Sequence, residues 1–214
     1  MLTRSVVLRR AGLAGVAVTA AVLLSACGGD DSTGSGMGHG SGMGTSAPAA
    51  SASAGAVFND ADVMFAHMMV VHHRQAIEMA SLADTRAASS DVKALATKIK
   101  QAQQPEIDTM NGWLTAWGKP APMASASGMD MGMGHGPMPG VMSDADMTQL
   151  AKAKGAEFDK QFLTMMISHH QGAISMAQQE TAQGSNPDAK TLAAKIITDQ
   201  QAEITQMQEL LTKV

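Results

Sequence analysis

A short pattern of soft metal-binding side chains occurs twice in the sequence. Met-Met-x-x-His-His lies at residues 68–73 and again at residues 165–170, and a further methionine, Met79 or Met176, follows the first histidine by seven residues. Residues three or four apart on a helix are neighbours, so thioether and imidazole groups would share one side. A soft, neutral thioether beside a borderline imidazole suits Cu(I), and Ag(I) by similar softness. The pattern therefore predicts a copper site.

The same residues have a purely structural interpretation, in which methionine fills irregular core space and each histidine is satisfied within the core. Adjacent histidines are costly to bury, because each needs hydrogen-bond partners. The pair also recurs at an identical offset from two methionines, which favours metal ligation. Zinc usually recruits cysteine, or several histidines with a carboxylate, and calcium or magnesium needs oxygen ligands that this pattern lacks.

The two patterns belong to an internal repeat. When the chain is shifted by 97 residues, 62–114 aligns with 159–211 without a gap, and 22 of the 53 aligned positions are identical. Duplication of one supersecondary unit explains this register. The repeat also pairs Glu106 with Glu203, which we consider as direct ligands, as partners that orient the imidazoles, or as ordinary charges at a bundle edge. The candidate ligands of the repeated units are His72, His73, Met68, Met69, Met79, Glu106, Met110, His169, His170, Met165, Met166, Met176, Glu203 and Met207.

Each repeat unit predicts two helices. In the first unit, apolar side chains and His72 recur on one helical face from Phe65 to Ala83. A break follows near residues 87–90, where Ser90 is the expected cap of the second helix, and the second unit breaks at Asn186-Pro187-Asp188. A short extra helix is expected over 144–153. Two hairpins can cover each other's apolar faces, which predicts an all-α, four-helix bundle with approximate twofold symmetry. Pairing of hairpins from two chains would cover the apolar faces equally well, so a homo-oligomer is an alternative to the monomeric bundle.

The expected organisation has five parts. Residues 1–27 form a signal peptide, 28–56 a disordered tether, 57–117 the first hairpin, 118–143 a Met/Gly-rich linker and 144–214 the second hairpin. Tether and linker are rich in small and polar residues and are expected to be flexible, with no core role. Their soft side chains are expected to be auxiliary copper ligands, with low-complexity drift as the alternative. These residues are Met37, His39, Met43, Met129, Met131, Met133, His135 and Met138.

The N-terminus predicts export and lipid anchoring. Three arginines within the first ten residues precede an uncharged apolar stretch, 11–24, that is short for a membrane span. It ends in Leu-Ser-Ala-Cys, which looks like a bacterial lipobox with Cys27 as the lipidated residue. An ordinary secretory signal is the alternative, and adjacent arginines leave twin-arginine export open. We expect the protein on the outer face of the cytoplasmic membrane or in another extracytoplasmic leaflet.

Composition and motifs limit the other classes of function. Charged residues are 16% of the chain and the formal net charge is −4. The sequence shows no basic patch, so nucleic acid is not expected as a partner. Helical bundles host di-iron oxidases, but those need several Glu and Glu-x-x-His motifs, and neither Glu106 nor Glu203 has a histidine three residues on. We therefore expect a binding protein and no enzyme. An interaction protein that uses the methionine face without metal is the other alternative.

The repeated motif resembles a known family. It runs from an aspartate and phenylalanine through Met-x-x-His-His-x-x-Ala-Ile-x-Met-Ala, and continues after the break with Leu-Ala-x-x-Ile-x-x-x-Gln-x-x-Glu-Ile-x-x-Met, at residues 159–177 and 192–207. Both units resemble the "domain of unknown function 305" family. This resemblance implies a ferritin-like four-helix arrangement and extracytoplasmic copper binding and tolerance, as in characterised members. Sequestration and delivery to a copper-accepting or copper-donating protein both stay open. One departure is that Gln75 in the first unit becomes Gly172 in the second, so the two sites need not be equivalent.

Overall fold

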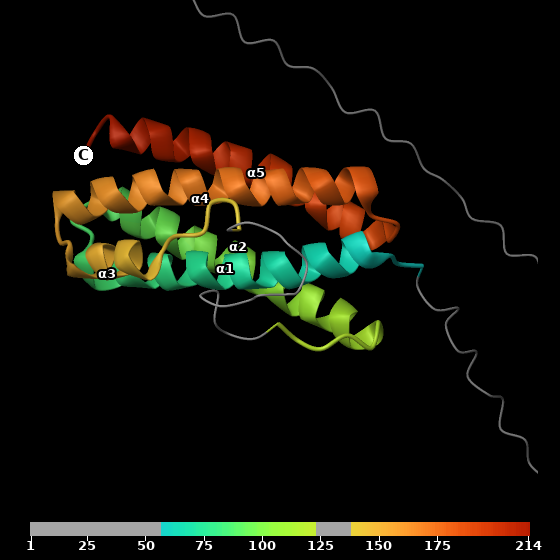
Figure 1. Cartoon of the computed structure of the whole chain (residues 1–214). Coiled ribbons are helices and arrows are strands. Elements are labelled where there is room, and N and C mark those ends of the chain that lie inside the picture. The colour runs from blue at the N-terminus through green and yellow to red at the C-terminus, as the bar shows by residue number, and fades with distance from the viewer. Residues whose placement is uncertain (1–56, 123–137) are drawn as a thin grey trace, which may run out of the picture. The chain divides into compact units, whose positions relative to one another are not determined.

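The computed structural model of this protein describes residues 57–122 and 138–214, and its regular elements in these ranges are helices (Figure 1). They are α1 (Asp60–Arg86), α2 (Ser90–Ala116), α3 (Asp144–Lys152), α4 (Ala156–Gln183) and α5 (Pro187–Leu211). The prediction of an all-α protein is confirmed. No helix within these ranges has both the length and the apolarity that a membrane crossing requires.

Capping residues explain where the long helices begin. Asn59 caps α1 in a capping box with Asp62, and Asn186 caps α5 ahead of a proline in its first turn, as predicted. The expected cap of α2 was one residue late: the side chain of Ser89, not Ser90, accepts a hydrogen bond from the Val92 amide. The second helix of each hairpin therefore begins where the sequence pattern places it, to within a residue.

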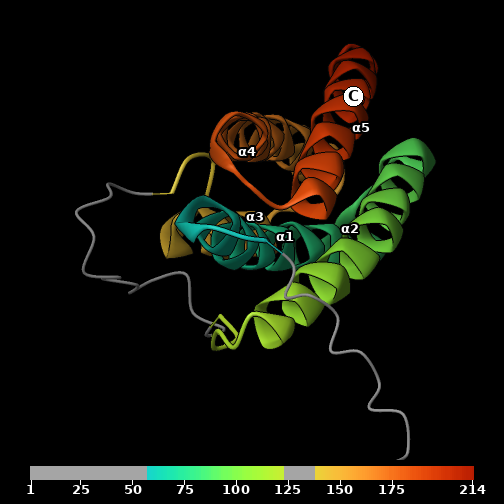
Figure 2. The same ribbon diagram turned by 90° about the vertical axis from the view of Figure 1, so that its right-hand side faces the viewer.

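The helices form two hairpins that meet through α1 and α4. Within each hairpin, α1 packs against α2 and α4 against α5, and α1 packs against α4 between them, whereas α2 and α5 touch little (Figure 2). The start of α1 lies beside the end of α4, where the Asn59 side chain donates a hydrogen bond to the Gln183 carbonyl. The end of α1 lies beside the start of α4, where the Gly155 amide donates to the Arg86 carbonyl. The two central helices are therefore antiparallel, which is the arrangement produced by a twofold axis perpendicular to them.

Two aspartates fasten the hairpins together reciprocally. The carboxylate of Asp62, on α1, accepts hydrogen bonds from the amides of Ser185 and Asn186 in the α4–α5 turn. Asp159, its equivalent on α4, accepts from the amides of residues 88 and 89 in the α1–α2 turn, at 3.2 and 2.8 Å. The sequence offset of 97 thus reappears as a spatial exchange, in which each hairpin satisfies turn amides of the other.

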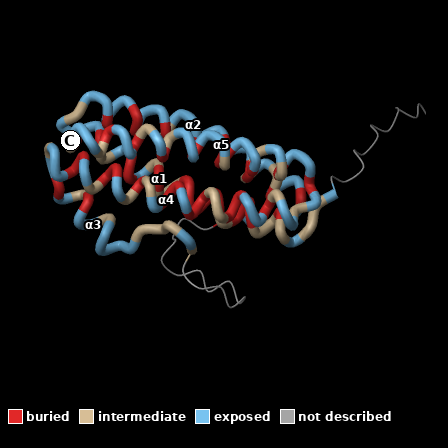
Figure 3. The backbone as a smooth tube through the Cα atoms, turned by 90° about the horizontal axis from the view of Figure 1, so that it is seen from above, coloured by how far each residue is buried: buried red, intermediate tan, exposed pale blue. Residues whose placement is uncertain are grey.

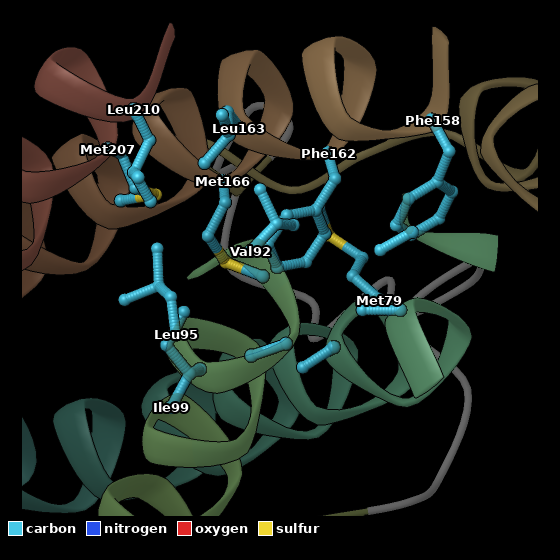
Figure 4. Packing of buried hydrophobic residues seen from close by; sticks show 14 of the residues in the cluster. Met79, Val92, Leu95, Ile99, Phe158, Phe162, Leu163, Met166, Met207 and Leu210 are labelled. Atoms are coloured by element: carbon cyan, nitrogen blue, oxygen red, sulfur yellow. The ribbon is translucent and has the colours of Figure 1, made fainter. Parts of the chain in front are cut away.

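Buried residues line the inner faces of the long helices (Figure 3) and form two apolar clusters. Cluster 1 joins the end of α1 and start of α2 to the start of α4 and end of α5, with Phe162, Met79 and Met166 pointing into it (Figure 4). Cluster 2 joins the opposite halves of the same helices, around Phe65 and Met69. Between the two clusters, the helices carry buried polar residues.

The end of the Met/Gly-rich linker also contributes to packing. Met138 is half-buried and packs against cluster 2. The expectation that the linker has no core role is therefore wrong for this residue, because the chain turns back across α4 directly after it. The short helix α3 ends at Lys152, close to the expected boundary, and buries Leu150 in cluster 1.

Candidate metal centre

Four buried histidines lie in the middle of the bundle, between the two apolar clusters. His72 and His73 come from α1, and His169 and His170 from the equivalent turn of α4; all four are fully buried. Two glutamates and two glutamines from the outer helices accompany them. We call this set the histidine layer, and it comprises His72, His73, Gln103, Glu106, His169, His170, Gln200 and Glu203.

The first histidine of each pair meets its equivalent across the α1–α4 interface. The ring centroids of His72 and His169 are 3.7 Å apart, with 39° between the ring planes. Antiparallel packing of α1 and α4 produces this meeting, since equivalent residues near a twofold axis become neighbours. The two histidine pairs therefore approach one another through these two rings.

The second histidine of each pair is held by a glutamate of its own hairpin. Nε2 of His73 lies 2.9 Å from Oε2 of Glu106, and Nε2 of His170 lies 2.7 Å from Oε2 of Glu203. A carboxylate accepts hydrogen bonds, so in both rings Nε2 carries a proton, and Nδ1 is the nitrogen that stays free of this bond. This is the arrangement by which carboxylates orient metal-binding imidazoles. Of the roles considered for the two glutamates, the geometry fits that of an orienting partner.

Burial favours the neutral form of His72, His73 and His169. Burial, and then the neighbouring His73, lower the pKa of His72 from 6.5 to about 3. Burial likewise lowers the pKa of His73, although the hydrogen bond to Glu106 acts in the opposite direction. For His169, burial and the adjacent His72 place the pKa well below 6.5. The neutral ring is the form that binds metal ions, so these side chains can act as ligands without first losing a proton at neutral pH.

Several ring nitrogens of the layer have no hydrogen-bond partner among residues 57–122 and 138–214. They are Nδ1 of His72, His73 and His170 and both nitrogens of His169, five in all. A buried, unsatisfied polar atom costs about 1–3 kcal/mol, so such a group is costly to keep in a metal-free core. In neutral rings these five atoms are four lone pairs, one on each ring, and the N–H of His169. Four lone pairs fit a site that binds a cation, because coordination satisfies them.

The candidate methionines divide between the two sides of the layer. Met69, Met110 and Met176 are buried in cluster 2, and their repeat equivalents Met166, Met207 and Met79 are buried in cluster 1. Met68 and Met165 are half-buried and pack against clusters 2 and 1. The thioethers therefore flank the imidazoles within one or two helical turns on either side, and all of them also fill apolar space.

The sequence interpretation missed two members of the layer. Gln103 and Gln200 are almost fully buried, and the Gln103 amide group and the Gln200 carbonyl oxygen have no hydrogen-bond partner. Both precede the layer glutamates by three residues, on the same helical face. The occurrence of glutamine at equivalent positions of both repeat units was the sequence signal that could have identified them. The halves also differ: the Lys195 ammonium lies 3.2 Å from Oε1 of Glu106.

Some predicted ligands lie outside the described residues. These are the auxiliary ligands at positions 37, 39, 43, 129, 131, 133 and 135, and the lipidation site Cys27. The segments that flank 123–137 are both held on α1: Arg74 donates to the Pro122 carbonyl, and Gln75 exchanges hydrogen bonds with the backbone of Met142. Within residues 57–122 and 138–214, no three His, Cys, Asp or Glu side chains form a group that would hold a metal ion by themselves.

Comparison with known proteins gives several matches. The crystal structure of a DUF305 protein from Streptomyces coelicolor, assigned as secreted, is 34% identical, with a TM-score of 0.64 over 72% of this chain and 93% of that chain. CopM in its Cu(II)-bound form is 36% identical, with a TM-score of 0.60 over 71% and 96% of the two chains. CopM structures with Cu(I) and with Ag bound also match.

Two further comparisons concern the sequence alone. An uncharacterized protein of Acanthamoeba polyphaga mimivirus is 43% identical over 53 residues, and the match spans 25% of this chain and 35% of that relative. The model of the family described as "Domain of unknown function (DUF305)" matches residues 62–211, which include both hairpins and the segment between them. The chain therefore belongs to the DUF305 family.

Proposed function

We propose that this protein binds copper outside the cytoplasm, and that the histidine layer is its principal site. The observation that carries the proposal is the convergence of four buried imidazoles with five unpartnered ring nitrogens between the hairpins. Nδ1 of His72 and a nitrogen of the adjacent His169 would bind the ion, and Nδ1 of His73 and of His170 are further donors of the layer, although within the described residues no three such groups are already arranged around one point. The solved CopM structures with copper or silver bound support this proposal, since they share the fold at more than 30% identity.

The chemistry of the donors favours Cu(I). Neutral imidazoles, with thioethers on both sides and no cysteine in the layer, suit a soft monovalent ion better than Zn²⁺ or a hard cation. The methionines of the tether and linker are proposed to add weaker, independent copper sites. We propose sequestration for metal tolerance, or transfer to another extracytoplasmic protein, and no catalytic role.

Export and lipid anchoring at Cys27 complete the proposal. They rest on the Leu-Ser-Ala-Cys sequence behind the apolar N-terminal stretch, and the likeness to a Streptomyces coelicolor protein assigned as secreted supports export. A lipid anchor with the intervening tether would hold the helical domain near the membrane, where exported copper passes. Transfer and storage would then use the same histidine layer.

The test is a competition for Cu(I) against a chromophoric chelator at pH 7.5, with Ag(I), Zn(II) and Fe(II) offered in parallel. The test variant is His72→Ala/His169→Ala in a protein that lacks residues 123–137. The matched control is His67→Ala, which removes another nearly buried histidine of α1 outside the layer. We expect the double variant to lose the tightest Cu(I) site and the control to retain it.

Folding of each variant is checked by circular dichroism, and His72→Gln/His169→Gln replaces the alanine pair if the latter does not fold. Unchanged Cu(I) stoichiometry and affinity in a folded double variant would contradict the proposal. A preference for Fe(II) or Zn(II) over Cu(I) would also contradict the proposal, because imidazole and thioether donors should favour the softer ion. Deletion of 123–137 alone should lower the number of bound copper ions and leave the tightest site intact.

A further inference from the structure

Residues 138–142, which we call the strap, cross the surface of α4 in direct backbone contact. Gly172 makes this possible: a Cβ atom at that position would lie 2.1 Å from the Pro139 carbonyl oxygen and 2.8 Å from Cα of Gly140. Gly140 has φ of +76°, and a Cβ there would lie 2.7 Å from the Ser168 carbonyl oxygen. The strap can therefore take this path only with glycine on both sides of the contact.

The repeat equivalent of Gly172 holds the same strap from the opposite helix. Gln75 donates from Nε2 to the Met142 carbonyl and accepts from the Met142 amide, each at 2.8 Å. These two bonds reproduce the pairing of one backbone with another, so the side chain fixes both position and direction of the strap. The departure between the two units, Gln75 against Gly172, thus has one explanation: both residues seat the strap.

The seated strap touches the histidine layer at one ring. Nε2 of His72 lies 3.2 Å from the Pro139 carbonyl oxygen. A carbonyl only accepts, so Nε2 carries the proton and Nδ1 keeps its lone pair. In the equivalent ring, His169, neither nitrogen has a partner of normal hydrogen-bond geometry among the described residues. The strap therefore adds a second difference between the two halves of the layer, beside the contact of Lys195 with Glu106.

We propose that Gln75 and Gly172 are positioning residues of the metal site, which act through the strap to present Nδ1 of His72 as the ligand atom. The ligand role of His72 rests on the function proposed above. The fixed tautomer does not, because the geometry of the metal-free protein defines it. Loss of a group that orients a metal ligand typically costs 10–100-fold in affinity, and that is the expected size of the effect here.

The first measurement is made on the metal-free protein. Long-range ¹H–¹⁵N spectra of the histidine rings report the tautomer of His72, and hydrogen exchange of the Met142 amide reports whether the strap is seated. Gly172→Ala and Gln75→Leu should convert His72 from one defined tautomer to a mixture and speed exchange at Met142. Gly112→Ala is the matched control, since that helical glycine has open space around it; it should change neither reading.

The second measurement is the Cu(I) affinity of the tightest site for the same variants in the full chain. We expect both strap variants to bind 10–100-fold more weakly and Gly112→Ala to bind like the parent. An unchanged tautomer and exchange rate in Gly172→Ala would overturn the proposal, as would an altered tautomer with parental Cu(I) affinity. If the parent bound no Cu(I), the proposed function and the ligand role of His72 would both fail, while the spectra would still decide whether the strap fixes the tautomer.

Discussion

The buried, neutral state of His72 has a consequence for the acid stability of the metal-free protein. Its pKa is lowered from 6.5 to about 3, by burial first and then by His73. Below pH 6.5 the unfolded chain takes up a proton at this ring that the folded protein does not. Stability is therefore complete above pH 6.5 and falls as the pH drops from 6.5 towards 3.

The magnitude follows from the two pKa values. At pH 5.0 the ring of the unfolded chain lies 1.5 pH units below its pKa, which favours unfolding by about 2 kcal/mol relative to pH 7.5. Burial lowers the pKa of His73 and His169 in the same direction. Those two rings therefore add to the loss.

The assay is urea denaturation of metal-free protein, with a chelator present, at pH 7.5 and 5.0. Other groups also titrate in this range, so the comparison is made against His72→Gln, in which the ring is absent and the remaining groups are kept. The parent should lose about 2 kcal/mol more than His72→Gln between the two pH values. Equal losses would show that His72 is not held neutral, and the account of the layer would be wrong at that ring.

The same shift changes the expected pH dependence of copper binding. An imidazole with its usual pKa would weaken as a ligand as the pH falls through about 6.5. With the pKa of His72 near 3, protonation competes little with the ion at pH 5.0, and the acid sensitivity passes to folding instead. Cu(I) affinity of the folded layer should therefore change little between pH 7.5 and 5.5.

Three further outcomes are expected. Burial, and then Asp62, raise the pKa of Glu180 from 4.5 to about 8. The contribution of Glu180 to stability is therefore complete below pH 4.5 and falls by about 1.4 kcal/mol per pH unit up to pH 8. Glu180→Gln should flatten this part of the stability profile measured with urea, and an unchanged slope would contradict the assignment. Asp62→Ala and Asp159→Ala each leave turn amides without their acceptor and should lower the free energy of unfolding by at least about 2 kcal/mol, against less than about 1 kcal/mol for the exposed Asp60→Ala; equal effects would argue against the reciprocal contacts. Cys27→Ala should move the protein from the membrane fraction to the soluble fraction, and membrane retention with processing elsewhere would refute lipid anchoring.

The repeat carried most of the fold and much of the site. Because 22 identities hold over 53 positions in one register, two equivalent hairpins were predictable, and with them the approach of His72 to His169. The glutamates were recognised as candidates for the same reason. Helix starts followed from local capping chemistry, which needs no tertiary contact, so the largest error among them was the single residue between Ser89 and Ser90.

The rest depended on contacts that a residue pattern does not encode. Pro139 contacts His72 through its backbone carbonyl. Every residue has this group, so the residue type at position 139 does not predict the contact. Gln75 and Gly172 were visible as a departure from the repeat, but their purpose appears only when the strap lies between them. Methionine is ambiguous by nature: the same thioether fills apolar space and binds soft metals, so its sequence position alone does not separate the two roles.

The reciprocal bonds of Asp62 and Asp159 make each hairpin incomplete without the other. If one hairpin separates, its partner loses the acceptor for the amides of its own turn, and the interface where His72 meets His169 opens at the same time. Unfolding of a single hairpin is therefore not favoured over unfolding of the whole bundle, and the bundle should melt in one cooperative transition. A chain with only one of the two hairpins could recover both contacts only by antiparallel pairing with a second copy of itself, which would rebuild the histidine layer across a dimer axis.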